Sequence, residues 1–136
     1  MIKQKTYLLE RGRTLKPDLD SSRPIYKQIA EIIKEEILKG NIEEEERVMS
    51  TNELSEFYQI NPATAGKGLN LLVDEGVLYK KRGVGMFVAK GARDKIIRER
   101  RQNFFNHYIE DLLREADKLN IDREELITMI KNYDPD

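Results

Sequence analysis

Two helix-start signals stand close together in the middle of the chain. The segment Ser50–Glu53 matches a capping box, in which the serine oxygen accepts from a backbone N–H three residues on and the glutamate reaches back. Asn61 and Pro62 form the second signal, because asparagine is a favoured N-cap and proline suits the first helical position. We therefore expect one short helix to about Tyr58 and another from Pro62 to about Gly76. Two short helices separated by a few residues are typical of a helix-turn-helix.

A third helix is expected before this pair. From Pro24 onward, five isoleucines recur at the three-and-four spacing of one buried helical stripe: Ile25, Ile29, Ile32, Ile33 and Ile37. Pro24 suits the first turn of this helix and Gly40 its C-terminal cap. The acidic run Glu43–Glu46 that follows is interpreted as a solvated loop.

Two short β-prone runs follow the helix pair. Val77–Tyr79 and Met86–Val88 enclose Lys80–Gly85, whose two glycines allow the tight backbone of a hairpin tip. The segment also places three consecutive cations at the solvent end of the hairpin. A basic hairpin after a helix-turn-helix predicts a wing, so the fold class is mainly α with a small β-hairpin: a winged helix-turn-helix domain over 23–90.

The C-terminal part, 91–136, is predicted to hold two helices. One runs from about Arg93 to Leu119 and stops at Asn120, and Asp122–Glu125 caps a last helix that extends through Tyr133. Their apolar stripe is wider than one partner helix covers, which predicts self-association, with folding back onto the N-terminal part as the alternative. The residues assigned to this dimerisation surface are Phe104, Phe105, Tyr108, Ile109, Leu112, Leu113, Ala116, Leu119, Leu126, Ile127 and Ile130.

Residues 1–22 are expected to form an N-terminal arm or a short strand. Tyr7–Leu9 is the candidate strand, and the basic Arg11–Arg13 could enter a minor groove as a flexible arm.

The net charge of −1 conceals a segregation of sign along the chain. Successive blocks carry +4 (1–30), −6 (31–61), +6 (62–101) and −5 (102–136). The +6 block contains the second helix of the pair and the wing. Such segregation suggests one region that faces a polyanion while others stay solvated, so near-neutrality does not count against DNA binding.

Other function classes find little support. The chain has no cysteine, which excludes a disulfide framework, a thiolate zinc site and a cysteine nucleophile. The single histidine, His107, has no partner at metal-ligand spacing, and no phosphate-binding glycine loop is present. We expect no enzyme activity, no cofactor and no metal. No run approaches the roughly 18–20 apolar residues that span a bilayer, so a cytoplasmic protein is expected.

The ordered motifs resemble those of a known family. Pro24–Ile29, Ser50–Leu54, Asn61–Thr64, Asp74–Leu78 and Arg82–Val88 are similar to the GntR family of bacterial transcriptional regulators, and most of all to its YtrA subfamily. Members of that subfamily have a winged helix-turn-helix followed by a short two-helix dimerisation tail. The resemblance implies a homodimeric repressor on a palindromic double-stranded DNA operator, whose half-sites lie about one helical turn apart or slightly more.

The resemblance also implies which residues contact DNA. They are Ser50, Thr51, Asn52, Asn61, Ala63, Thr64, Lys67, Lys80, Lys81, Arg82, Gly83 and Gly85. Their chemistry fits: helix N-termini and hydroxyls bind phosphate, lysine and the wing cations release counterions, and amide side chains can hydrogen-bond base edges.

This chain departs from the family pattern at several positions. Met49 stands where proline is usual, and Asn52 stands where arginine is common, which would shift base preference from guanine toward adenine. Gly66 and Gly68 lie inside the expected second helix of the pair, at a cost of about 1 kcal/mol each relative to alanine. We expect close helix packing at Gly68, whereas the pattern offers no account of Gly66.

Three further expectations concern an alternative function, a small-molecule effector and the target genes. The alternative function is a winged-helix module for protein–protein contact, in which the acidic blocks meet a basic partner. A small-molecule effector, if there is one, is expected between the tail helices and the winged domain, near Phe104, Phe105 and Tyr108. Membership of the YtrA subfamily would associate the chain with transporter genes.

Overall fold

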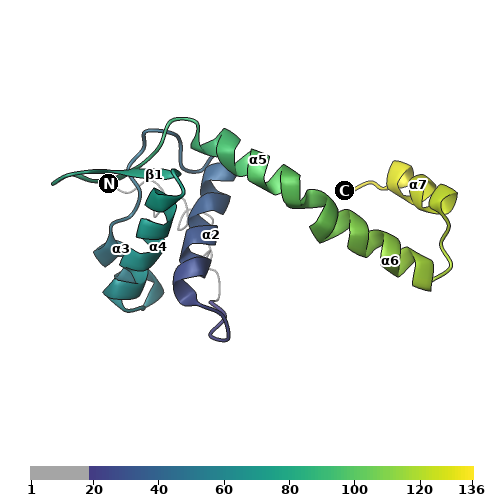
Figure 1. Ribbon diagram of the computed structural model, residues 1–136, viewed down its shortest axis with the longest axis horizontal. Coiled ribbons are helices and arrows are strands. Elements are labelled where there is room, and N and C mark those ends of the chain that lie inside the picture. The colour runs from purple at the N-terminus through teal and green to yellow at the C-terminus, as the bar shows by residue number, and fades with distance from the viewer. Residues whose placement is uncertain (1–18) are drawn as a thin grey trace. The chain divides into compact units, whose positions relative to one another are not determined.

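The computed structural model describes residues 19–136. The candidate strand Tyr7–Leu9 and the basic Arg11–Arg13 therefore lie outside the described residues. The described chain is mainly helical with one two-stranded hairpin, as expected, and it divides into two compact units, one ending at Ile97 and the other spanning Arg98–Asp136. The first unit contains α2 (Ile25–Leu38), α3 (Thr51–Tyr58), α4 (Pro62–Asp74), β1 (Leu78–Lys81) and β2 (Gly85–Val88) (Figure 1).

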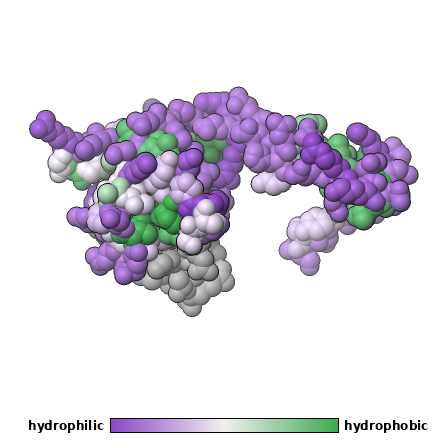
Figure 2. Space-filling model, turned by 60° about the horizontal axis from the view of Figure 1, so that its bottom comes forward, coloured by the Kyte–Doolittle hydropathy of each residue, from purple (hydrophilic) through white to green (hydrophobic). Residues whose placement is uncertain are grey.

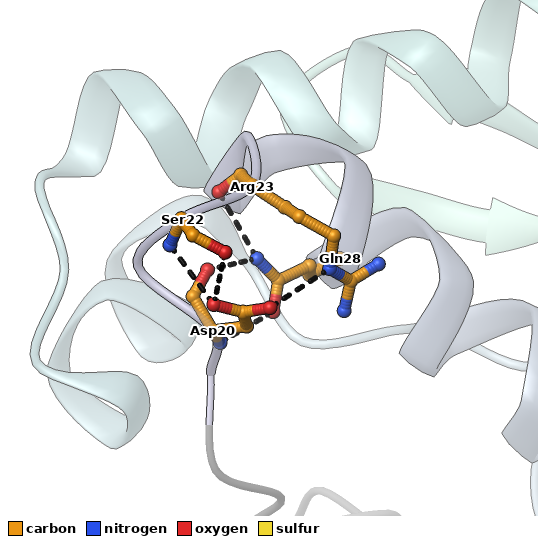
Figure 3. Close-up of polar contacts among 4 residues, drawn as sticks. All are labelled: Asp20, Ser22, Arg23 and Gln28. Atoms are coloured by element: carbon orange, nitrogen blue, oxygen red, sulfur yellow. Dashed lines mark hydrogen bonds and ion pairs between the residues drawn. The ribbon is translucent and has the colours of Figure 1, made fainter.

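Helix α2 begins without a side-chain cap from Pro24, and a buried glutamine supplies other contacts there (Figure 3). Gln28 is only 7% exposed; its Nε2 donates to the carbonyl oxygens of Asp20 (2.6 Å) and Arg23 (3.1 Å), and its Oε1 accepts from Asp20 N (2.8 Å). The Asp20 carboxylate accepts from the hydroxyl and backbone N–H of Ser22 and pairs with Arg23. The bonds from Ser22 and Arg23 lower the pKa of Asp20. These contacts tie the segment before α2 to the helix itself.

The hydrophobic core of the first unit lies among α2, α3, α4 and the hairpin. The predicted α2 stripe is confirmed, with Ile29, Ile33 and Ile37 buried, and Gly40 ends the helix at a φ of +84°. The other large, fully buried side chains are Leu69, Leu72, Val48, Val77, Val88 and Ile96. Tyr58 of α3 also enters this core; burial, with the charge of Glu36 adding to it, raises the pKa of its phenol to about 12. The buried ring is therefore neutral at physiological pH.

The segment that links α2 to α3 is more than the solvated loop that its acidic run predicts. Glu45 N donates to Val88 O (2.8 Å), Val88 N to Glu46 O (2.9 Å) and Val48 N to Met86 O (2.9 Å), and Arg47 forms an antiparallel bridge with Phe87. Residues 45–48 thus pair with β2 along its outer edge. The acidic run is a loop with exposed Glu43, Glu44 and Glu45, as predicted, but the pairing at its end was not predicted, because backbone pairing does not depend on side-chain charge.

The second unit contains the end of α5 (Ala92–Phe104), the π-helix η1 (Phe105–Ile109), α6 (Glu110–Lys118) and α7 (Arg123–Asn132). A regular helix to Leu119 was expected, but η1 interrupts the α geometry; a π turn holds an extra residue, which offsets the apolar stripe before and after it. Asn120, at a φ of +58°, ends α6 as predicted. Asp122 caps α7 by accepting from Glu125 N (2.8 Å), also as predicted.

No helix within residues 19–136 has the length and apolar character needed to cross a membrane.

Candidate nucleic-acid interface

The N-terminus of α3 is built by the predicted capping box. Glu53 N donates to Ser50 Oγ (3.1 Å), and Ser50 N donates to Glu53 Oε1 (2.8 Å). Partial burial raises the pKa of Glu53, but the hydrogen bonds from Ser50 and the charge of Arg47 outweigh it and leave the pKa below its ordinary value. The reciprocal bonds fix the first turn, where Thr51 is half-buried and Asn52 is exposed.

Helix α4 begins at the second predicted signal. Asn61 Oδ1 accepts from Ala63 N (2.8 Å), and Pro62 occupies the first helical position. The Asn61 side chain therefore caps α4, in addition to the DNA contact that the family resemblance implies. One face of α4 packs inward through Ala65, Gly68, Leu69 and Leu72. The opposite face exposes Ala63, Lys67 and Asn70, with Thr64 half-buried beside them.

The two glycines inside α4 have different surroundings. A Cβ at Gly68 would lie 2.9 Å from the carbonyl oxygen of Tyr26 and 3.2 Å from Cβ of Ile29, so α2 and α4 meet there with no room for a side chain. The expected close packing at Gly68 is therefore confirmed. A Cβ at Gly66 would meet only Thr51, at 3.7 Å, so packing does not require that glycine.

The hairpin presents its cations in different directions. Lys80 pairs with Met86 and Lys81 with Gly85, while Arg82, Gly83 and Val84 form the turn. Side chains alternate along a strand, so Lys80 and Lys81 lie on opposite faces. Lys81 Nζ lies 4.8 Å from the centroid of the Phe87 ring, which stacks on Tyr79 with centroids 5.9 Å apart. The three cations therefore do not all gather at the tip: of the three, only Arg82 belongs to the turn.

The hairpin projects from the helices of the first unit (Figure 1), and its turn exposes both Arg82 and the apolar Val84. Gly83 adopts a φ of +76° within the turn, a conformation that favours glycine. Lys80, Lys81, Arg82 and Gly83 are exposed, and Gly85 is half-buried. A basic, projecting turn can reach a phosphate backbone that a flatter surface would not.

Arg47 is a residue of this region that the sequence pattern did not single out. Its Nη1 lies 3.5 Å from Glu53 Oε1 of the capping box, and its Nε lies 3.5 Å from the carbonyl oxygen of Val84 in the hairpin turn. A Cβ at Gly85 would lie 2.9 Å from that Nε. Arg47 therefore connects the start of α3 with the hairpin. The one available signal was a lone cation directly after the acidic run.

Tyr26 is a second residue of this region that the sequence analysis did not assign to the interface. Tyr26 lies in the first turn of α2, off the isoleucine stripe, and its ring lies under Lys67 of α4, with Nζ 4.2 Å from the ring centroid.

The residues assigned to self-association lie in the second unit. Only Ala116 is buried among residues 98–136, all of which the structure describes, while Ile109, Leu113 and Leu126 are half-buried. The remaining predicted residues of this surface are exposed: Phe104, Phe105, Tyr108, Leu112, Leu119, Ile127 and Ile130. Figure 2 shows hydrophobic residues among hydrophilic ones on the part that holds α6 and α7.

The amino-acid sequence is similar to those of known proteins. The family model described as "Bacterial regulatory proteins, gntR family" matches residues 25–88. The HTH-type transcriptional repressor YtrA of Bacillus subtilis (strain 168) is 29% identical over 119 residues, which cover 88% of this chain and 91% of the relative. These matches span the helices, the hairpin and part of the C-terminal helices.

Two solved structures are similar along most of their length. A GntR-family transcriptional regulator from Bacteroides thetaiotaomicron is 34% identical with a TM-score of 0.64, covering 79% of this chain and 93% of that chain. YtrA from Sulfolobus acidocaldarius, a GntR-family transcription factor, is 31% identical with a TM-score of 0.52, covering 86% and 93%. The capped helix pair, the basic hairpin and these matches place the chain in the GntR family, as a DNA-binding transcriptional regulator and not an enzyme.

Proposed function

We propose that the chain is a transcriptional repressor that binds a palindromic DNA operator as a homodimer. The observation that carries this proposal is the pairing of an exposed face of α4 with a projecting basic hairpin on one small core. An α-helix fits the major groove, and the hairpin would contact the flanking minor groove or backbone. Asn52, Asn61 and Thr64 would face base edges or phosphates, and Lys67, Lys80, Lys81 and Arg82 would face phosphates.

Homodimer formation is supported by the exposed apolar side chains of the second unit. Phe104 and Phe105 are each 53% exposed, Tyr108 is 65% exposed and Ile130 is 59% exposed. Exposed apolar groups gathered in so short a segment mark an interaction surface. A second copy is the partner that a two-fold operator requires, because palindromic half-sites mirror the symmetry of the bound protein.

Repression, rather than activation, is supported by the B. subtilis relative, a transcriptional repressor similar over 88% of this chain. Control of transporter genes is a prediction from the subfamily resemblance, and a small-molecule effector is a prediction from the aromatic residues Phe104, Phe105 and Tyr108.

The proposal is tested by selecting binding sites from random duplexes and measuring affinity for the selected site by fluorescence anisotropy. Counterion release predicts an affinity that falls steeply between about 50 and 200 mM salt. The selected site should be an inverted repeat, and sedimentation should give one dimer per duplex. A scrambled duplex of equal length and composition is the matched control.

Three results would contradict the proposal. Equal affinity for the selected and scrambled duplexes would contradict sequence-specific recognition. A monomer bound to a single half-site would contradict the proposed homodimer. A dimer that binds no DNA at low salt would favour the alternative, a module for protein–protein contact.

A further inference from the structure

The crossing of α2 and α4 brings the first turn of α2 against Gly68, on the inward face of α4. At Gly68 a Cβ would lie 2.9 Å from the Tyr26 carbonyl oxygen and 3.2 Å from Cβ and Cγ2 of Ile29. The backbone of α4 at Gly68 therefore lies directly against α2, with no space for a further side chain. The residue that precedes Gly68 is therefore carried to the edge of α2, next to the Tyr26 side chain.

That neighbour is Lys67, and its ammonium group rests over the Tyr26 ring. Nζ lies 4.2 Å from the ring centroid, Lys67 is exposed and Tyr26 is half-buried. A cation over an aromatic face at this distance is attracted by the ring quadrupole. The ring occupies one side of the ammonium group, whose three N–H donors point in different directions, so donors remain for a phosphate oxygen.

We infer that Tyr26 is a positioning residue of the DNA interface, which holds the Lys67 ammonium group where it meets a phosphate of the duplex. The inference rests on the proposed function, because it assigns Lys67 a DNA contact. A lysine side chain that is confined before binding loses less rotamer entropy on binding than a mobile one. Through this contact α2, which lies outside the helix-turn-helix pair, contributes to DNA affinity.

A purely structural role for the ring makes a different prediction, so the experiment separates the two. We would measure affinity for the selected duplex at several salt concentrations for Tyr26→Phe, Tyr26→Leu, Lys67→Met and the double variant with Tyr26→Leu and Lys67→Met. Thermal unfolding of each variant checks that the fold is retained. Tyr26→Phe keeps the aromatic face and is the matched control for loss of the ring.

If Tyr26 acts through Lys67, Tyr26→Phe should stay within about twofold of the wild type, and Tyr26→Leu should bind about two- to fivefold more weakly. Lys67→Met should reduce the salt slope by about one. In the Lys67→Met background, Tyr26→Leu should then cause no further loss.

A second substitution keeps the test valid if Tyr26→Leu unfolds. Pentafluorophenylalanine in place of Tyr26 keeps the shape of the ring but reverses its quadrupole, so it should weaken binding as Tyr26→Leu does, relative to Tyr26→Phe. Equal affinities for the fluorinated ring and for Tyr26→Phe would overturn the inference. So would a loss from Tyr26→Leu that persists in the Lys67→Met background, or a Tyr26→Phe variant as weak as Tyr26→Leu, which would assign the effect to the hydroxyl group.

Failure of the proposed function looks different from failure of this inference. A wild-type protein that does not bind the selected duplex would overturn both. A wild-type protein that binds with a steep salt dependence, together with an unchanged Tyr26→Leu variant, would overturn the positioning role alone.

Discussion

Gly66 and Gly68 stand two positions apart in one helix, yet only the second is required by its surroundings. Both lower the helix propensity of α4 by the same amount, since neither offers a side chain to restrict the unfolded backbone. Gly68 faces the backbone of α2 at a distance that excludes a methyl group, whereas Gly66 faces Thr51 with ordinary contact distances to spare. The same residue type therefore has two different consequences for stability.

Gly68→Ala should destabilise the protein by about 1–3 kcal/mol, because its methyl group would collide with the Tyr26 carbonyl oxygen and force the helices apart. Gly66→Ala is the matched variant and should stabilise the protein by up to about 1 kcal/mol through helix propensity. Urea denaturation at one fixed protein concentration measures both. Equal effects of the two substitutions would contradict this account of the α2–α4 crossing.

At the scale of the element, α3 depends on its N-terminal contacts more than on propensity. It spans only Thr51–Tyr58, and isolated helices of that length are not stable in water. Its first turn is held by the reciprocal bonds of Ser50 and Glu53, and Arg47 then connects that turn to the hairpin. The Glu53 carboxylate thus takes part in both the cap of α3 and the contact through Arg47 to the hairpin turn.

Ser50→Ala should lower the free energy of unfolding by about 1 kcal/mol, the usual cost of losing an N-cap side chain. Because the Ser50 hydroxyl helps to hold the pKa of Glu53 below its ordinary value, the difference from the wild type should be complete near neutral pH. It should shrink as the pH falls through that lowered pKa, where the folded state takes up the proton. Denaturation curves measured between neutral and acidic pH check both statements.

Thr51→Ala is the control for this prediction, since it removes a neighbouring hydroxyl group that takes no part in the capping box. A loss of stability as large as that of Ser50→Ala would mean that the cap is not the source of the effect.

At the scale of the whole molecule, charge is arranged by segment and not by total. The block 62–101, which holds α4 and the hairpin, carries +6, while 102–136 carries −5. A nearly neutral protein of this kind should bind DNA weakly in general and strongly through one face. The hairpin turn is the most projecting part of the basic block within the first unit (Figure 1).

Arg82→Ala should weaken binding to the selected and scrambled duplexes by the same factor and reduce the salt slope by about one, because a phosphate contact carries no sequence information. Arg114→Ala is the matched control: it also removes one arginine, but from α6, where the side chain pairs with Glu110 at 2.8 Å and Asp111 at 3.1 Å. Anisotropy titrations at several salt concentrations measure the slopes. An unchanged slope for Arg82→Ala would exclude the hairpin turn from the interface.

Local order could be read from the amino acids because it depends on residues a few positions apart. Each helix cap joins groups within about one helical turn, so neighbouring residues in the sequence are enough to predict it. Examples are the capping box at Ser50, the Asn61–Pro62 start and the helix ends at Gly40 and Asn120. The isoleucine stripe of α2 followed from periodicity, and the hairpin followed from two β-prone runs that enclose a turn with two glycines. The DNA-contact and dimerisation assignments stay predictions, because they concern molecules outside the chain.

Contacts between distant segments left no such signal. The pairing of residues 45–48 with β2 depends on backbone groups that every residue carries, so an acidic run gives no warning of it. The π turn at Phe105–Ile109 likewise has no residue signature in this chain. Lys67 meets Tyr26, and Arg47 meets Val84, because packing at Gly68 and along β2 brings together residues far apart in sequence. Helices and turns follow from short-range chemistry, whereas the interface they build depends on how closely their backbones approach in space.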